Sequence, residues 1–175
     1  MESASILQTI AEVAIGLAGF GGIAAGLGYR TRGRWSEQDR LRLVGMVANS
    51  LAVVFGCLLP FAIHHLGVQH PWSLSGAVLA LAPAWFLWLQ WRRVFAPARP
   101  GRVKVQSGYN PALAGALALI YLAALLLFLV SAIDLPRPEG AFGLYLAAVL
   151  LLLFSAAATF LRLLATAFGE DEPAA

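Results

Sequence analysis

Residues Ser5–Gly28 read SILQTIAEVAIGLAGFGGIAAGLG, an apolar run in which Glu12 is the single charged side chain. The hydrocarbon core of a bilayer is about 30 Å thick, and about 20 apolar residues in an α-helix cross it. This run of 24 residues is long enough to cross a bilayer as a helix. The residues before it carry Glu2 and no basic side chain, whereas a signal peptide starts with basic residues. We therefore predict a retained first membrane span over residues 6–28.

The composition extends this prediction to the whole chain. Of its 175 residues, 60% are hydrophobic and only 12% are charged, which is too apolar for a soluble domain of this size. Four further apolar stretches follow the first one. We predict an all-α integral membrane protein, a five-transmembrane helical bundle that forms one membrane domain over residues 1–175. Its helices are expected at 6–28, 37–63, 74–91, 112–133 and 142–167.

Basic residues gather in two of the loops and predict the orientation. One group lies between the first two spans and one between the third and fourth: Arg30, Arg32, Arg34, Arg40 and Arg42, then Arg92, Arg93, Arg99, Arg102 and Lys104. The positive-inside rule places both loops in the cytoplasm, with the N-terminus outside and the C-terminus cytoplasmic. We expect Arg30, Arg32, Arg34, Arg92 and Arg93 to meet lipid headgroups or the cytoplasm. Topology accounts for these charges, so no nucleic-acid partner is expected.

Small residues line one side of the first span. Ala14, Ala18, Gly22 and Gly26 recur every four residues and end in a GxxxG pattern. Such a row lets two helix backbones approach closely in a membrane. Three partners are open for it: the other helices of the chain, a second copy of the same helix, or the lumen of a pore.

Glu12 is the first candidate for a functional polar residue. At about 1.5 Å per residue it lies about 6 Å below the outer boundary of its span, and His64 and His65 end the second span on that same side. A carboxylate paired with an imidazole there would form a proton-sensitive site. In the alternative, Glu12 reaches the outer interface together with Gln8, and the histidines only flank the membrane.

A second polar level is expected near the cytoplasmic side. Asn49 and Ser50 lie in the second span, and Ser155 and Thr159 lie one helical turn apart in the fifth. These groups either form hydrogen bonds between helices and to helix carbonyls, or they continue an ion path from Glu12.

Tryptophan and proline mark the third span. Trp85, Trp88 and Trp91 share part of one helix face at its cytoplasmic end, which fits either an interfacial anchor or a contact with a partner or ligand. Pro60 and Pro83 are expected to bend or break their helices.

The chain carries no sequence motif of an enzyme, a nucleotide-binding loop or a metal site. We therefore expect no enzyme activity, no cofactor and no metal. The preference for Arg over Lys, with abundant Ala and Leu, favours a bacterial inner (plasma) membrane. Two functions are predicted. One is a homo-oligomeric pore or small transport protein for protons or ions that uses the Gly-rich first helix. The other is a non-catalytic scaffold or accessory subunit of a larger membrane complex.

Overall fold

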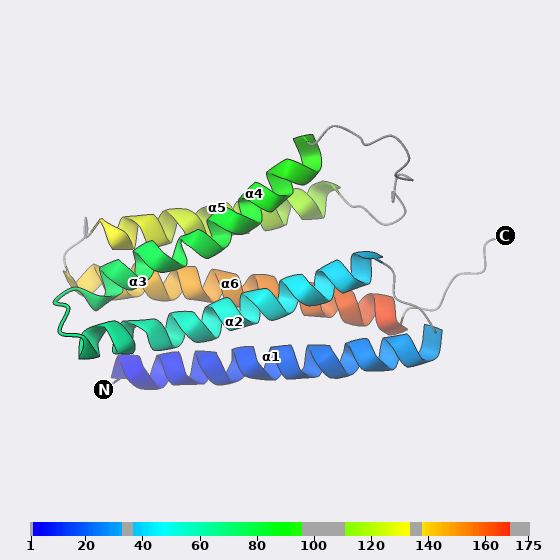
Figure 1. The fold of residues 1–175 in the computed structure, drawn as a ribbon, viewed down its shortest axis with the longest axis horizontal. Helices are drawn as coiled ribbons and strands as arrows, with labels where there is room; N and C mark the ends of the chain where they lie inside the picture. The colour runs from blue at the N-terminus through cyan, green and yellow to red at the C-terminus, as the bar shows by residue number, and fades with distance from the viewer. Residues whose placement is uncertain (1, 33–36, 96–110, 134–137, 169–175) are drawn as a thin grey trace. The chain divides into compact units, whose positions relative to one another are not determined.

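The structure, a computed structural model, describes residues 2–32, 37–95, 111–133 and 138–168 (Figure 1). Within these ranges the chain is helical and contains no strand. The helices are α1 (Glu2–Arg32), α2 (Glu37–His65), α3 (Pro71–Leu79), α4 (Leu81–Phe95), α5 (Pro111–Ala132) and α6 (Pro138–Phe168). The prediction of an all-helical chain is confirmed.

Five stretches of the described helices are long and apolar enough to cross a membrane. They are Ser3–Leu27, Arg40–His65, Pro71–Arg92, Ala114–Ala132 and Gly140–Ala165. The predicted number of candidate spans is therefore confirmed. The first and last helices extend beyond their predicted ends, α1 to Arg32 and α6 from Pro138. These extra turns carry the more polar sequence that flanks each apolar run.

The third candidate span is not one continuous helix. Ala80 separates α3 from α4, although its backbone N–H still bonds to the carbonyl of Gly76 at 2.9 Å. Pro83 has no N–H for the carbonyl of Leu79, so the helical ladder is interrupted at this point. The expected effect of Pro83 is thereby confirmed. Pro60, in contrast, does not interrupt α2.

Proline and glycine also account for where several helices begin and end. Pro71, Pro111 and Pro138 each stand at the first position of a helix, where a missing N–H breaks no helical bond and the ring favours helical φ. After α2, Gly67 adopts a φ of 79° and its N–H bonds to the carbonyl of His64 at 3.0 Å. A left-handed residue of this kind ends many helices and favours glycine.

The chain divides into two compact units, residues 1–62 with 152–175, and residues 63–151. In the first unit α1 lies along α2 and the C-terminal part of α6. Among the described glycines of α1, only Gly21 has atoms near its missing Cβ: a Cβ there would overlap the end of the Met46 side chain and lie 3.8 Å from Phe160. Gly21 thus leaves space that the flexible end of Met46 fills.

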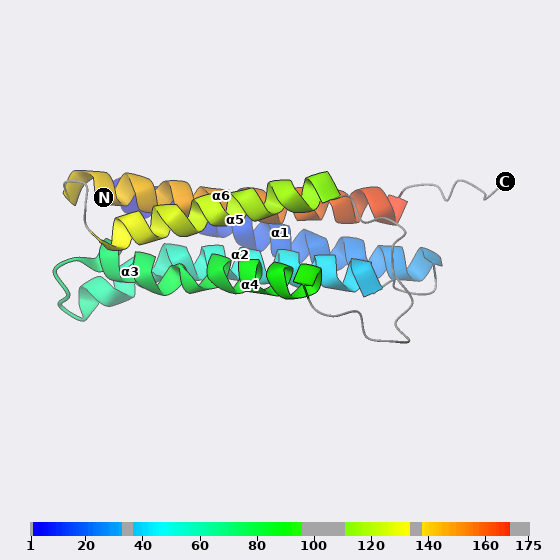
Figure 2. The same cartoon turned by 90° about the horizontal axis from the view of Figure 1, so that it is seen from above.

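In the second unit α3 and α4 run along α5 in the opposite direction (Figure 2). The ring of Phe86 stacks on Tyr121 at 5.0 Å, with the two rings tilted by only 6°. At the other end a Cβ on Gly76 would lie 3.0 Å from the backbone carbonyl of Phe128. Stacked rings hold one end of this helix pair and a glycine contact holds the other.

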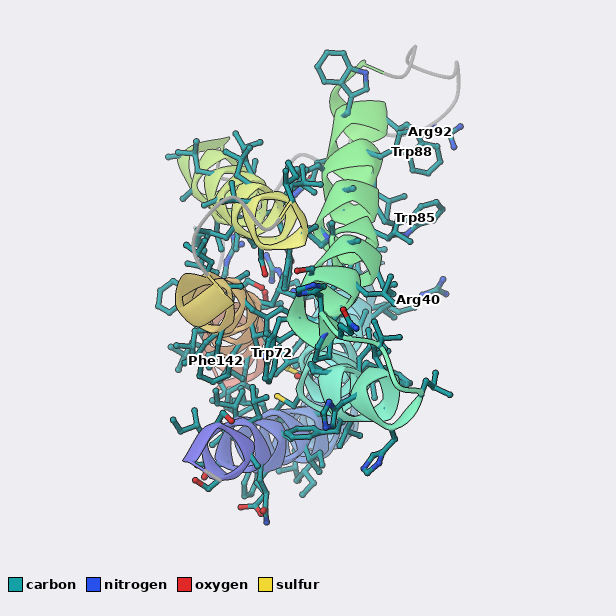
Figure 3. All side chains as sticks on the ribbon, turned by 90° about the vertical axis from the view of Figure 1, so that its left-hand side faces the viewer. Arg40, Trp72, Trp85, Trp88, Arg92 and Phe142 are labelled. Atoms are coloured by element: carbon teal, nitrogen blue, oxygen red, sulfur yellow. The ribbon has the colours of Figure 1, made fainter. Side chains whose placement is uncertain are left out.

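An aromatic cluster joins α3, α5 and the start of α6 within the second unit. Trp72 lies edge-on to Phe142 at 4.9 Å (Figure 3). Its ring is also 5.7 Å from that of Tyr145, which in turn meets Phe128 edge-on at 5.7 Å. Tyr145 and Phe128 are fully buried. Edge-to-face pairs of this kind add to the stabilisation from burial alone.

The Gly76 contact yields a test of this packing. Gly76→Leu should lower the free energy of unfolding by about 1–3 kcal/mol, because the added atoms meet a backbone carbonyl that cannot rotate away. The measurement is the unfolding of the purified protein in mixed detergent micelles. Gly115→Leu on α5 is the matched control, since a Cβ there meets nothing within 4 Å. Equal losses in the two variants would contradict the contact.

Candidate functional site

Helix α1 has two faces of different character. One is buried and contains, at spacings of three, four or seven residues, Leu7, Ile10, Ala14, Gly21 and Ala24. The residues of the opposite face are exposed. We call this the outward face of α1, and it contains Gln8, Glu12, Gly19, Gly22 and Gly26 together with the exposed apolar side chains Ile15 and Ile23. The two faces follow from the helical period, because residues three and four apart lie on the same side.

The polar part of the outward face is a hydrogen-bonded pair. The side-chain amide of Gln8 donates to the carboxylate of Glu12 at 3.0 Å, and both side chains are exposed. The bond joins two side chains that lie one helical turn apart. Glu12 and Gln8 thus lie together, as in the alternative in which both reach the outer interface, but that they reach it stays a prediction. Glu12 lies in the first compact unit while His64 and His65 lie in the second, so the predicted carboxylate–imidazole pair stays a prediction.

The predicted row of small residues divides between the two faces. Ala14 is buried and Ala18 is half-buried, whereas Gly22 and Gly26 are exposed. A Cβ built on Gly19, Gly22 or Gly26 meets no atom within 4 Å. Among the described residues, the GxxxG pair Gly22–Gly26 therefore has open space around it, and the choice among its three possible partners stays a prediction.

A polar pair lies inside the first unit. The side-chain amide of Asn49 on α2 donates to Ser155 Oγ on α6 at 2.9 Å, and both residues are buried. Ser155 Oγ in turn donates to the carbonyl of Leu152 at 2.8 Å. Thr159 adds a bond from its hydroxyl to the carbonyl of Ser155 at 2.8 Å. The structure thus brings together three of the four residues expected at this level.

The fourth residue, Ser50, differs from the others. It is buried on α2 next to Asn49, and its hydroxyl has no hydrogen-bond partner among the described residues. The bonds of Asn49, Ser155 and Thr159 are of the two kinds expected for a packing role, between helices and back to a helix carbonyl. An ion path through this level remains a prediction.

The basic and imidazole residues lie at the ends of helices. His64 and His65 are exposed in the last turn of α2, with ring centroids 6.1 Å apart. Arg92 is exposed on α4. Arg30 and Arg32 stand in the last turn of α1, but their side chains and that of Arg93 lie outside the described part, as does all of Arg34. Among the described residues no three His, Cys, Asp or Glu side chains come together.

Sequence reasoning missed several residues that organise the structure. Gly21 was not distinguished from the other glycines of the first span, although its spacing from Ile10 and Ala14 fits the buried face. Ser131 was also missed. It is buried on α5 and donates to the carbonyl of Ala141 at 3.3 Å. A lone serine inside an apolar span is a weak signal of such a bond between segments.

No family model, curated protein or solved structure matches this chain.

The Asn49–Ser155 hydrogen bond can be measured directly. Asn49→Ala, Ser155→Ala and the double variant form a thermodynamic cycle, and we expect a coupling free energy of about 0.6–1.7 kcal/mol in detergent unfolding experiments. Ser50→Ala paired with Ser155→Ala is the control cycle and should show no coupling. A zero value for the first cycle would show that the bond contributes nothing to stability and would contradict the expectation.

Proposed function

We propose that the protein is a homo-oligomer of a bacterial inner membrane that passes protons or small ions along the outward face of α1. The N-terminus is outside and the C-terminus cytoplasmic, because the basic loop residues other than Arg137 then lie in the cytoplasm. Five candidate spans support a multipass arrangement. The protein acts in this proposal without a cofactor.

One observation carries the proposal. Within the candidate span Ser3–Leu27, α1 exposes a carboxylate and three glycines, with Ile15 and Ile23 among them, on the face turned away from the described helices of its own unit. Ionisable groups inside membranes usually face protein or water, since a charge at the bilayer centre costs roughly 2.5–3.5 kcal/mol on insertion scales. Glu12 lies nearer the boundary and costs less, but a lipid-facing position is still unfavourable.

A second copy of α1 satisfies both parts of this face. Gly19, Gly22 and Gly26 allow close backbone contact between two helices, and close contact is the main source of helix association in lipid. Around the Gln8–Glu12 pair the same packing would exclude lipid and leave a polar lining between the copies. Closely packed glycines leave no room for ions between two backbones, so the proposed path runs beside the glycine contact, between the copies of α1 that surround it. Asn49, Ser155 and Thr159 are not assigned to the path, because they already form hydrogen bonds inside the first unit.

The same face also fits the scaffold alternative. A helix of a larger membrane complex could cover Gly22 and Gly26 as a second copy would, with no transport by this chain. Measurements of oligomeric state and of ion flux separate the two functions, since a scaffold needs neither to associate with itself nor to pass ions.

The oligomer is tested first. Replacing both Gly22 and Gly26 by Leu should raise the dissociation constant of the oligomer by about tenfold or more, because bulky side chains would hold the two backbones apart. Oligomeric state is measured by analytical ultracentrifugation in mild detergent. Gly115→Leu, another exposed glycine with open space around it, should leave the oligomer intact. A monomeric wild-type protein would overturn the proposal.

The transport step is tested by removing the carboxylate. Purified protein in liposomes should dissipate an imposed proton gradient, and Glu12→Gln should reduce the flux to that of empty liposomes while the oligomer is retained. Glu139→Gln removes an equal charge in the first turn of α6, outside the candidate span, and should keep the wild-type flux. An oligomer without any flux would favour the scaffold instead.

A further inference from the structure

Three residues of α4 form a continuous exposed row. The rings of Trp85 and Trp88 lie 4.8 Å apart, tilted by 32°, and the guanidinium of Arg92 lies over the Trp88 ring at 4.7 Å from its centre. The three side chains project from the same side of α4 (Figure 3). We call this row the Trp–Arg ladder.

The ladder is not part of the packing of α4 within its unit. That packing uses Phe86, which stacks on Tyr121 of α5, and Pro83, which is fully buried. Trp85 and Trp88 are 58% and 43% exposed, so much of two large aromatic surfaces has no cover from the chain. These side chains are therefore available to a molecule from outside.

The position of the ladder matches the layers of one lipid leaflet. Arg92 is the last residue of the candidate span Pro71–Arg92 and so stands at its boundary. Trp85 precedes Arg92 by seven residues and therefore lies about 10 Å deeper in the candidate span, at about 1.5 Å per residue. A lipid beside α4 would therefore set its headgroup at Arg92, its glycerol region at Trp88 and the start of its acyl chains at Trp85.

Arg92 has no carboxylate in its own stretch of the chain to balance its charge. No Asp or Glu occurs between Asp39 and Asp134, while Arg92 is followed by Arg93, Arg99, Arg102 and Lys104. Among the anions at a membrane surface, the phosphodiester of an anionic lipid lies at the depth of Arg92 and attracts basic residues there.

The ring of Trp88 also holds the guanidinium of Arg92 in an orientation that can bind such an anion. A guanidinium over an aromatic face is held by the cation–π attraction, and its N–H groups still point outward from its edge. Those N–H groups form a planar fork that matches two phosphate oxygens. Because the ring restrains the flexible side chain beforehand, less conformational entropy is lost when the phosphate binds.

We propose that Trp85, Trp88 and Arg92 form a binding site for one anionic phospholipid of the phosphatidylglycerol type. Arg92 binds the phosphodiester, Trp88 holds Arg92 in place, and Trp85 contacts the upper acyl chains. The site requires that the chain lies in a bilayer, but it does not depend on an oligomer or on ion flux.

The full-length protein in detergent, titrated with phosphatidylglycerol and followed by native mass spectrometry, tests the site. The wild type should bind the first phosphatidylglycerol at least about fivefold more tightly than phosphatidylcholine, which has the same phosphodiester but no net charge. Arg92→Gln and Trp88→Leu should each weaken phosphatidylglycerol binding by about five- to tenfold. The affinity of Arg92→Lys for phosphatidylglycerol should fall between those of the wild type and Arg92→Gln, since lysine keeps the charge and loses the planar fork.

Two variants serve as matched controls. Arg40→Gln removes the same charge from an exposed arginine at the start of the candidate span Arg40–His65. Trp91→Leu removes an exposed tryptophan from α4 outside the ladder. Both should bind phosphatidylglycerol like the wild type, and circular dichroism should show equal helix content in all variants. The proposal is overturned if Arg40→Gln weakens binding as much as Arg92→Gln, or if the wild type does not prefer the anionic lipid.

Discussion

Helix α1 can bury only one of its two faces against the helices of its own unit. Leu7, Ile10 and Ala14 start the buried face, and Gly21 continues it by admitting the side chain of Met46. Once this face is used, the helical period leaves Glu12, Gly22 and Gly26 on the other side. The exposed carboxylate and the open glycines both follow from this single choice of face.

Much of the architecture was predictable from the sequence because apolar length is a local property. Each span needs about 20 residues, and the five stretches of this length became the five candidate spans. The effect of Pro83 was predictable for the same reason, since proline removes one specific N–H from the backbone hydrogen bonds of the helix. Pro60 shows the limit of that rule, because its surroundings in α2 accommodate the missing bond without ending the helix.

The choice of face was less predictable because it depends on residues distant in sequence. Six glycines between Gly16 and Gly28 offer a smooth surface on nearly every side of the first span, and the regular small-residue row favoured Gly22 and Gly26 as the close contact. The structure uses Gly21 instead, where Met46 and Phe160 from two other helices converge. The polar level was predicted more closely, since few polar side chains are available inside apolar spans to pair with Asn49.

The Asn49–Ser155 bond joins residues 106 positions apart, and this separation has a consequence for biosynthesis. At about 5–20 residues per second, the ribosome needs roughly 5–20 s after Asn49 to reach Ser155. In the proposed membrane arrangement, the side-chain N–H of Asn49 needs water or the insertion machinery as a partner during that interval, because hydrocarbon offers none. The hydrogen bond between α2 and α6 can form only after α6 has been made, so the last helix completes the contact that the second one begins.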